Sequence, residues 1–422
     1  MISKMPYLSH RDNTTRKVLL YCLGFFFILQ FLVKNAEVSD VGKYLIEIVF
    51  LWCLTRGVYR PAIVNSIGIK APITIAVLMF FELAVTSVFN AVPFGNIIVG
   101  LLGHYLGFFV FFVAIYIFTI DDYKKLFRLF YYYQFVNLGC SLYQYVVLGY
   151  YQDLNNGAFT GGATQDFFCG LLIVYYYSSY IRKTESFNKC VFILISSVII
   201  AILQEEKFIL AEIAIVVLYQ AIVGKKNIRN VLVISLFIAA IPVIVSKMGE
   251  INGEYASMSL SSTQNIADNL TTEGSGYGFP RIGSLPLITA AFFQDAQDIL
   301  LGFGCGACEN TTLSIADKTF IDRYGDLNYF QYPIQLTYLQ TGLIGVCLYV
   351  SFFVTLLVYN IIKRKQTDYR FRFVYDIAIM VNIICVALIW YNQTLKWYYA
   401  ILPFLFLALG PVCTRQIKNN EL

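Results

Sequence analysis

Residues 301–310, LGFGCGACEN, combine three glycines with a Cys-x-x-Cys spacing at Cys305 and Cys308. Three roles are compatible with that composition: a phosphate cradle, a metal or redox clip, or a bend. A phosphate cradle needs its glycines between a buried strand and a following helix, a context that is not met here. A zinc site needs two more soft ligands than this stretch offers. A disulfide between the two cysteines stays open. The glycines are therefore expected to form a tight bend after a helix.

The stretch QEEK at 204–207 is a second group of residues with chemical potential. Glu205 and Glu206 are carboxylates that can accept a proton, and Lys207 is a cation directly beside them. Asp166 is the next candidate for a proton acceptor. The alternative for QEEK is a solvated turn in which Lys207 pairs with its acidic neighbours.

Ionisable residues also interrupt several apolar stretches. Glu82 and His104 lie at equal distances in sequence before and after Pro93. A helical hairpin around Pro93 would bring them to a similar depth as partners. Glu47 and Glu212 fall in the outer halves of their own stretches. Such groups face a bundle interior or a watered cavity, or they form hydrogen bonds between helices without any substrate.

The chain that carries these residues is 58% hydrophobic and 14% charged over 422 residues. One soluble core does not bury that much apolar surface, so an all-α, polytopic membrane protein is expected. At about 20 apolar residues per crossing, the sequence predicts about 12 transmembrane helices. The apolar stretches are residues 17–34, 38–55, 71–90, 97–119, 126–148, 166–181, 189–204, 208–223, 231–247, 334–362, 374–391 and 396–413.

The orientation follows from the basic residues. Most of the 31 Lys and Arg fall on the same side as the two termini. Because Lys and Arg accumulate on the cytoplasmic side of a membrane, both termini are predicted to be cytoplasmic. The first apolar run follows a basic leader and lacks a small-residue cleavage site, which is typical of an uncleaved anchor rather than a signal peptide.

The long polar segment 248–333 interrupts the apolar pattern and is predicted to lie outside the cytoplasm. The chain then divides into residues 1–247 with nine transmembrane helices, the segment 248–333, and residues 334–422 with three more. Acidic residues far outnumber basic ones in this segment, so nucleic acid is not an expected partner. Residues 284–301 are expected to form one amphipathic helix, with Ser284 as the N-cap and Gly302 as the stop.

Several of these features occur together in one order along the chain. They are Arg281, the helix from about 284 to 301, GFGCG at 302–306, and the GLIG motif Gly342-Leu-Ile-Gly345. GAFTGGATQDFFCGLL at 157–172 and QEEKFILAE at 204–212 precede them. This series resembles the bacterial O-antigen polymerase and ligase superfamily of Wzy type.

The resemblance implies a glycosyltransferase of the bacterial cytoplasmic (inner) membrane that needs no cofactor. Such an enzyme polymerises undecaprenyl-diphosphate-linked oligosaccharide units into an O-antigen or capsule on the external face. The lipid bilayer, a chain-length regulator and a flippase are the other implied partners. Chemistry of this kind needs cations for the departing diphosphate and a base for the acceptor hydroxyl.

Residues of the predicted external side supply candidates for these roles. Arg281 and Lys207 are expected to face the diphosphate, and Glu205 or Glu206 to act as the base. The alternative for Arg281 and Lys207 is an ordinary salt bridge or interfacial snorkelling. Further substrate-binding candidates are Gln165, Asp166, Tyr151, Asn310, Asn328, Gln331, Arg323 and Lys396. The intramembrane polar candidates are Glu47, Glu82, His104 and Glu212.

Two departures from the family pattern bear on the choice of reaction. The ligase branch carries a His-Asn pair where this chain has Gln331 and Tyr332, which makes a ligase less favoured. The basic residue before the eighth stretch is usually Arg and here is Lys207, which keeps the charge but loses bidentate phosphate geometry. The remaining alternative is a flippase or transporter, for which a long connector is expected near the middle of the chain.

Overall fold

The computed structural model of the protein describes residues 10–36, 61–223, 278–309 and 315–419, with isolated positions between 48 and 52 and between 235 and 251. All regular elements in these residues are helices, as predicted. The chain forms two compact units that are each discontinuous in sequence. Unit 1 comprises Met1–Cys53, Ile117–Ile266 and Thr367–Ile384, and unit 2 comprises Leu54–Tyr116, Ala267–Gln366 and Cys385–Leu422.

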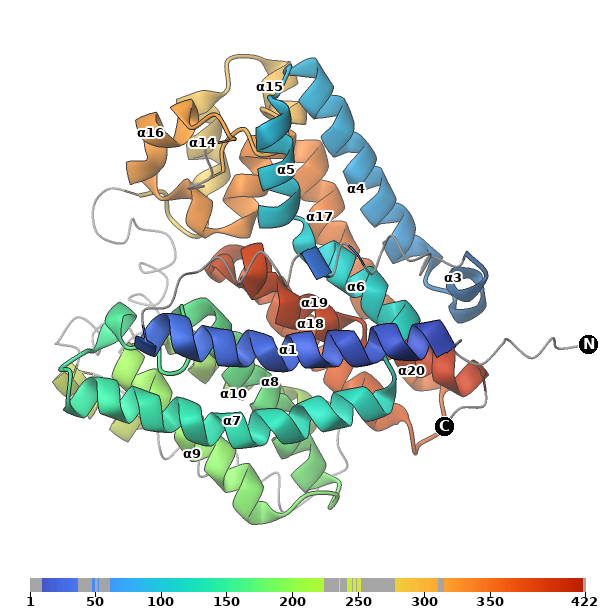
Figure 1. Cartoon of the computed structure of the whole chain (residues 1–422), viewed down its shortest axis with the longest axis vertical. Helices are drawn as coiled ribbons and strands as arrows, with labels where there is room; N and C mark the ends of the chain where they lie inside the picture. The colour runs from blue at the N-terminus through green and yellow to red at the C-terminus, as the bar shows by residue number, and fades with distance from the viewer. Residues whose placement is uncertain are drawn as a thin grey trace, which may run out of the picture. The chain divides into compact units, whose positions relative to one another are not determined.

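Unit 1 is a group of long helices, among which α1 and α7 run side by side (Figure 1). The hydroxyl of Tyr133 on α7 donates to the Phe27 carbonyl of α1 at 2.9 Å, and the two rings are 4.9 Å apart. The described helices wholly or mostly in unit 1 are α1 (His10–Ala36), α7 (Ile120–Val146), η1 (Gln152–Leu154), α8 (Gly162–Ile181), α9 (Phe187–Gln204), α10 (Lys207–Val223) and α18 (Arg372–Tyr391).

Unit 2 is built around α17, which packs along α4, while the short helices α14 and α15 lie near its first half (Figure 1). Its described helices are α3 (Pro61–Ile67), α4 (Lys70–Phe89), α5 (Phe94–Gly103), α6 (Leu106–Ile117), α14 (Ser284–Phe292), α15 (Ala296–Leu301), α16 (Thr319–Tyr324), η3 (Gly325–Leu327), η4 (Tyr329–Gln331), α17 (Pro333–Gln366), η5 (Gln393–Leu395), η6 (Trp397–Ala400), α19 (Ile401–Leu407) and α20 (Leu409–Lys418).

Six described helical segments are long and apolar enough to cross a membrane, and the bent pair α5 and α6 raises the number to seven if it forms one span. The six are Asn13–Ala36, Lys70–Phe89, Phe187–Gln204, Pro333–Gln366, Arg372–Tyr391 and Trp397–Lys418. Helices α7, α8 and α10 occupy three more of the predicted stretches. The stretches 38–55 and 231–247 lie largely outside the described residues, so the number twelve stays a prediction.

The prediction of a single helix over 284–301 is wrong, because the helix is interrupted between α14 and α15. Asp295 adopts an extended conformation, and its carboxylate accepts the backbone N–H groups of Gln297 and Asp298 at 2.8 and 2.9 Å. A side-chain cap of this kind starts a new helix. Ser284 is the first residue of α14 rather than its cap, which is Gly283 with φ 85°. The predicted stop at Gly302 is confirmed.

The glycines of the 302–306 turn form the bend that the sequence predicts. Gly302, Gly304 and Gly306 have φ values of 67°, 92° and 72°, which lie in the left-handed region that favours glycine. Cys305 and Cys308 are buried free thiols. Burial raises the pKa of both, so they remain protonated near neutral pH.

The glycine turn docks onto a kink in α17. Gly342, within the GLIG motif, has φ 59° and interrupts the helix. The backbone N–H groups of Phe303 and Gly304 donate to the carbonyls of Leu339 and Gln340, both at 2.8 Å. A Cβ on Gly342 would lie 2.3 Å from the backbone of Leu300. The GFGCG and GLIG motifs are therefore two halves of one backbone joint.

The hairpin of α4 and α5 holds the other side of the same turn. Ser87 accepts the Cys305 backbone N–H at 3.0 Å, and Asn90 donates to the Gly302 carbonyl at 3.0 Å. Asn96 donates to the Gly306 carbonyl at 3.1 Å. A Cβ on Gly306 would lie 1.8 Å from the Asn96 carbonyl oxygen. The turn is thus fixed by polar groups on both of its faces.

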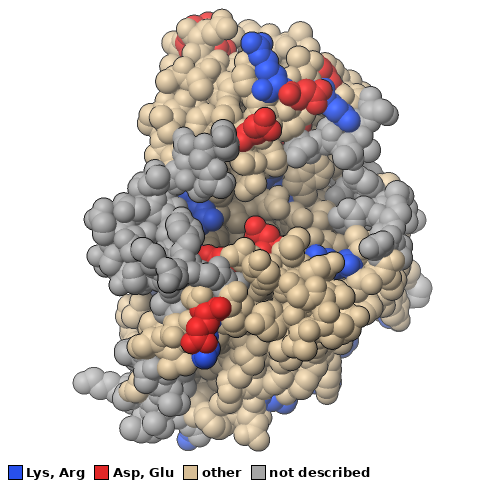
Figure 2. Space-filling model, turned by 90° about the vertical axis from the view of Figure 1, so that its left-hand side faces the viewer, with Lys and Arg blue, Asp and Glu red and all other residues tan. Residues whose placement is uncertain are grey.

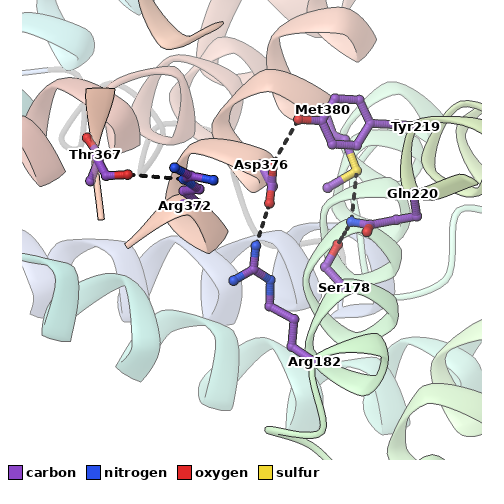
Figure 3. A network of polar contacts seen from close by, with 8 residues as sticks. All are labelled: Ser178, Arg182, Tyr219, Gln220, Thr367, Arg372, Asp376 and Met380. Atoms are coloured by element: carbon purple, nitrogen blue, oxygen red, sulfur yellow. Dashed lines mark hydrogen bonds and ion pairs between the residues drawn. The ribbon is translucent and has the colours of Figure 1, made fainter. Parts of the chain in front are cut away.

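A buried ion pair joins three helices of unit 1. Asp376 of α18 accepts from Arg182, the C-cap of α8, at 2.7 Å and from the hydroxyl of Tyr219 on α10 at 2.8 Å (Figure 3). Beside it, Gln220 donates to the Ser178 hydroxyl at 2.8 Å. The Asp376 side chain is 4% exposed and that of Arg182 is 22% exposed. A paired carboxylate at this position holds α8, α10 and α18 in one arrangement.

We predict that Gly306→Ala destabilises the protein strongly, because the new methyl group collides with backbone that is itself hydrogen-bonded and the residue keeps a positive φ. The measurement is thermal unfolding in detergent micelles. Gly139→Ala is the matched control, since Gly139 lies in α7 with no atom within 4 Å of an added Cβ. That control is expected to be neutral or to stabilise by about 0.5–1 kcal/mol. Equal melting temperatures for the two variants would show that the close approach of backbone at Gly306 does not contribute to stability.

We also predict that Asp376→Ala costs on the order of 3 kcal/mol of unfolding free energy, because it leaves Arg182 without its buried carboxylate. Denaturant unfolding in micelles measures this loss. Asp121→Ala is the control, because Asp121 pairs with Lys124 where both side chains are more than 60% exposed, and exposed pairs contribute little. A loss no larger than that of the control would show that the Asp376 pair is dispensable.

Candidate functional site

Arg281 lies in the short loop before α14, against two tyrosine rings of unit 2. Its guanidinium lies 4.5 Å from the centre of the Tyr391 ring, and its Nε donates to the Tyr332 hydroxyl at 3.4 Å. The Gln335 amide donates to the Pro280 carbonyl at 2.9 Å, which fixes the loop just before the arginine. Aromatic rings attract a guanidinium electrostatically and leave its charge unchanged.

Lys396, a reserve candidate in the sequence, is the second cation of unit 2. It is 1% exposed, and its ammonium donates to the Phe330 carbonyl at 2.6 Å. Burial lowers the pKa of Lys396, and the negative charge of Glu309 opposes that shift. Phe330 and Tyr332 are neighbours on one short segment, so residues 329–332 bind Lys396 at one point and Arg281 at the next. Two cations therefore contact residues of the same short segment, Lys396 through the Phe330 carbonyl and Arg281 through the Tyr332 hydroxyl.

Glu309 follows the glycine turn directly and is 2% exposed. Its Oε1 accepts from the Gln340 amide at 3.3 Å, and its Oε2 has no hydrogen-bond partner among the described residues. The Tyr329 hydroxyl donates to the Cys308 carbonyl at 3.0 Å, which holds the backbone just before the acid. Burial raises the pKa of Glu309, while the charge of Lys396 and the Gln340 hydrogen bond oppose that rise.

Glu309 is the site residue that sequence reasoning missed. In the sequence it counts only as one acid of an acidic external segment, for which a solvated position is the default. The signal that marks it is its place immediately after a bend that must pack tightly. A side chain at the end of a docked turn is carried into the interior with the turn.

Glu82 and His104 are both buried in unit 2, but the direct partnership expected for them is absent. The His104 Nε2 is 2.7 Å from the Thr337 hydroxyl, which leaves His104 paired with α17 instead. Neither carboxylate oxygen of Glu82 has a hydrogen-bond partner among the described residues. An added Cβ on Gly345 would lie 3.3 Å from Glu82 Oε2, so the GLIG motif makes room for this acid.

The QEEK residues lie in unit 1, where the local pairing considered from the sequence is observed. Lys207 forms an ion pair with Glu205 at 3.0 Å, and Gln152 donates to the other Glu205 oxygen at 3.0 Å. Glu205 is the C-cap of α9 with φ 59°. Both of its oxygens are therefore engaged. Lys207 and Arg281 belong to different units.

Three further acids cluster along the helices of unit 1. Asp166 and Glu212 are fully buried, and Glu206 is half-buried. A Cβ on Gly170 would lie 2.3 Å from the Glu212 carboxylate, and one on Gly162 would lie 2.4 Å from Glu206. Glycines on α8 thus admit two carboxylates of its neighbours.

A chain of amides lies beside these acids. The Gln204 amide donates to Gln165 at 2.8 Å, Gln165 donates to Asn137 at 3.0 Å, and Asn137 donates to Gln134 at 3.2 Å. The predicted candidate Gln165 is fully buried in this chain. Its hydrogen bonds are made within the protein, as buried amides require.

The remaining candidates are dispersed. Tyr151 is exposed in unit 1. In unit 2, the guanidinium of Arg323 lies 5.2 Å from the Tyr324 ring, and Gln331 donates to Asn328 at 3.4 Å. Asn310 and Glu47 lie outside the described residues. Of the candidates in unit 2, Arg281 and Lys396 both contact the segment 329–332. Gln331 belongs to that segment, and Asn328 directly precedes it.

The outer surface contrasts with these interior groups. On the face shown in Figure 2, most described atoms belong to residues that are neither acidic nor basic. Large apolar side chains of α4, including Val77, Phe81 and Val88, are exposed. An apolar exterior with charges held inside is typical of a membrane protein.

No protein-family profile matches the chain, and no curated protein matches it at a significant level.

Proposed function

We propose that the protein polymerises undecaprenyl-diphosphate-linked oligosaccharide units into a surface polysaccharide, by glycosyl transfer on the external face of a bacterial cytoplasmic membrane. The observation that carries this proposal is that Arg281 and Lys396 both contact the segment 329–332 of unit 2. Two cations held by one segment suit the two phosphates of a diphosphate better than a single one. The proposal includes twelve membrane crossings with both termini in the cytoplasm.

The reaction transfers a glycan from its lipid carrier to a hydroxyl of another repeat unit. The acceptor oxygen bonds to the anomeric carbon of the donor, and the bond from that carbon to the diphosphate oxygen breaks. The electron pair stays with the diphosphate, whose negative charge grows as the bond lengthens. Arg281 and Lys396 stabilise that charge, and a protein carboxylate takes the hydroxyl proton.

The charge distribution favours unit 2 over QEEK for the diphosphate. Lys207 is paired with Glu205, and Glu206 is a second acid next to it in the sequence. We therefore assign the diphosphate to unit 2. The apolar exterior provides a surface along which the polyprenyl tail lies in lipid.

The ligase and flippase alternatives remain as candidate functions with less support. Gln331 and Tyr332 occupy the neighbourhood in which the ligase branch carries its His-Asn pair, and Tyr332 contacts Arg281. A flippase would not need a proton acceptor beside paired cations. Neither alternative uses Arg281, Lys396 and a nearby acid together.

Gene deletion in a polysaccharide-producing host distinguishes the three. The lipid-linked glycans are extracted and sized. Single repeat units on the carrier at the external face identify a polymerase. Carrier-linked polymer that is not transferred onward identifies a ligase, and repeat units trapped on the cytoplasmic side identify a flippase.

We predict that Arg281→Ala lowers polymer formation at least about 100-fold with unchanged protein level, because one stabiliser of the leaving diphosphate is lost. The assay is complementation of the deletion strain, with polymer measured by gel electrophoresis. Arg281→Lys is expected to give intermediate activity, since it keeps the charge but loses the planar guanidinium. Lys318→Ala removes another basic residue of the same segment and is the control. Wild-type polymer from Arg281→Ala would exclude Arg281 from the site.

A further inference from the structure

Glu309 is a buried acid of unit 2 with one carboxylate oxygen engaged and the other without a partner among the described residues. Oε1 is held by Gln340 at 3.3 Å, and Oε2 has no partner among the described residues. A buried polar atom without a partner is costly unless something binds it. A hydroxyl that reaches Oε2 displaces no existing protein hydrogen bond, so this oxygen is ready to accept one.

Other carboxylates satisfy these conditions less well. Glu205 has both oxygens bound, by Lys207 and by Gln152. Asp317 is on the surface and accepts the backbone N–H and the hydroxyl of Thr319. Glu82 is on the transmembrane helix α4, enclosed by the GLIG motif. Glu309 alone among these acids interacts with Lys396, one of the two cations assigned to the diphosphate.

We propose that Glu309 is the base of the transfer, that its Oε2 accepts the proton of the attacking sugar hydroxyl, and that Lys396 and Gln340 are its positioning residues. This inference rests on the proposed function. In the step, the acceptor oxygen forms its bond to the anomeric carbon while its proton passes to the Glu309 carboxylate. The bond to the diphosphate breaks, and the diphosphate keeps the electron pair. The carboxylic acid later returns the proton to water.

The geometry gives each neighbour a distinct task. Gln340 fixes the carboxylate through Oε1 and leaves Oε2 open to the acceptor. Lys396 is tied to the Phe330 carbonyl, so its charge stays in place beside the acid. Gly103 packs against the same side chain, since a Cβ there would lie 3.4 Å from Glu309 Oε1. The acid is therefore held before any substrate binds, as an efficient base must be.

Of the titratable groups described around Glu309, Lys396 is the one whose charge affects the protonation of the acid near neutral pH. The groups come from the glycine turn, from η4 and from the residue before η6, and they are Cys305, Cys308, Tyr329 and Lys396. Burial raises the pKa of both thiols and of the phenol, so these remain neutral near pH 7. His104 interacts with Lys396 rather than directly with the acid. Lys396 is thus the cation whose removal should be felt at Glu309.

The test measures polymer formation against pH, with purified protein in lipid vesicles and the lipid-linked repeat units that accumulate in the deletion strain. A base acts only when deprotonated, so the wild-type rate should rise with pH through the raised pKa of Glu309. Glu309→Gln should lower the rate by about 100- to 10,000-fold and abolish this rising limb. Asp317→Asn, which removes an exposed acid of the same segment, should keep both the rate and the limb.

The second part of the test is the pH at which the rate rises, measured in Lys396→Met and Gln340→Leu. If Glu309 had only a structural role, these substitutions would not move that pH. Each removes a group that lowers the pKa of Glu309, so each should shift the rising limb to higher pH. Lys396→Met should also lower the maximal rate, because the lysine contacts the diphosphate. If Lys396→Met fails to fold, Gln340→Leu alone carries this part of the test.

The possible failures are distinguishable. A wild-type protein that makes no polymer from the accumulated units refutes the proposed function and the base together. An active wild type with an unchanged rate and limb in Glu309→Gln overturns the base and leaves the function standing. An unmoved limb in folded Lys396→Met and Gln340→Leu variants would likewise remove Glu309 from this role.

Discussion

Two backbone hydrogen bonds determine where the candidate site of unit 2 lies. Phe303 and Gly304 donate their N–H groups to the carbonyls of Leu339 and Gln340, which are available because Gly342 interrupts α17. An unbroken helix would use those carbonyls internally. The joint also needs both chains to approach without side chains, which glycine alone permits. The kink in α17 is therefore the condition for docking the glycine turn.

Gln340 links this joint to the chemistry. Its carbonyl accepts from Gly304, and its side chain donates to Glu309, five residues farther along the turn. The position of the acid is thus set by the same residue that receives the turn. The segment 329–332 also holds two groups at once. Its Phe330 carbonyl accepts from Lys396, and its Tyr332 hydroxyl accepts from Arg281. Contacts between segments far apart in sequence, rather than a shared helix face, bring the cations and the acid into one unit.

These connections explain what the sequence could and could not predict. Hydrophobic runs predict helices such as α4, α9 and α17 because lipid leaves few other ways to satisfy the backbone. The bend at 302–306 was predictable from glycine, and local pairing of Lys207 from adjacency. The break at Asp295 was not predictable, because the apolar periodicity continues through it. The Asp295 side chain caps a new helix by binding backbone N–H groups, and the sequence pattern does not show this bond. The burial of Glu309 and Lys396 was not predictable either, since it depends on contacts between residues far apart in sequence.

Both units bury charged side chains, and the two units differ in how these side chains are paired. A membrane protein needs no ionised group inside its helices for stability, and each one is costly to desolvate. In unit 1, the Arg182–Asp376 pair is fully engaged and joins three helices, which is a sufficient structural reason for it. In unit 2, Glu309 keeps one carboxylate oxygen without a partner among the described residues. A buried group that is held in place with an unpartnered atom gains from a substrate, because the substrate completes its interactions.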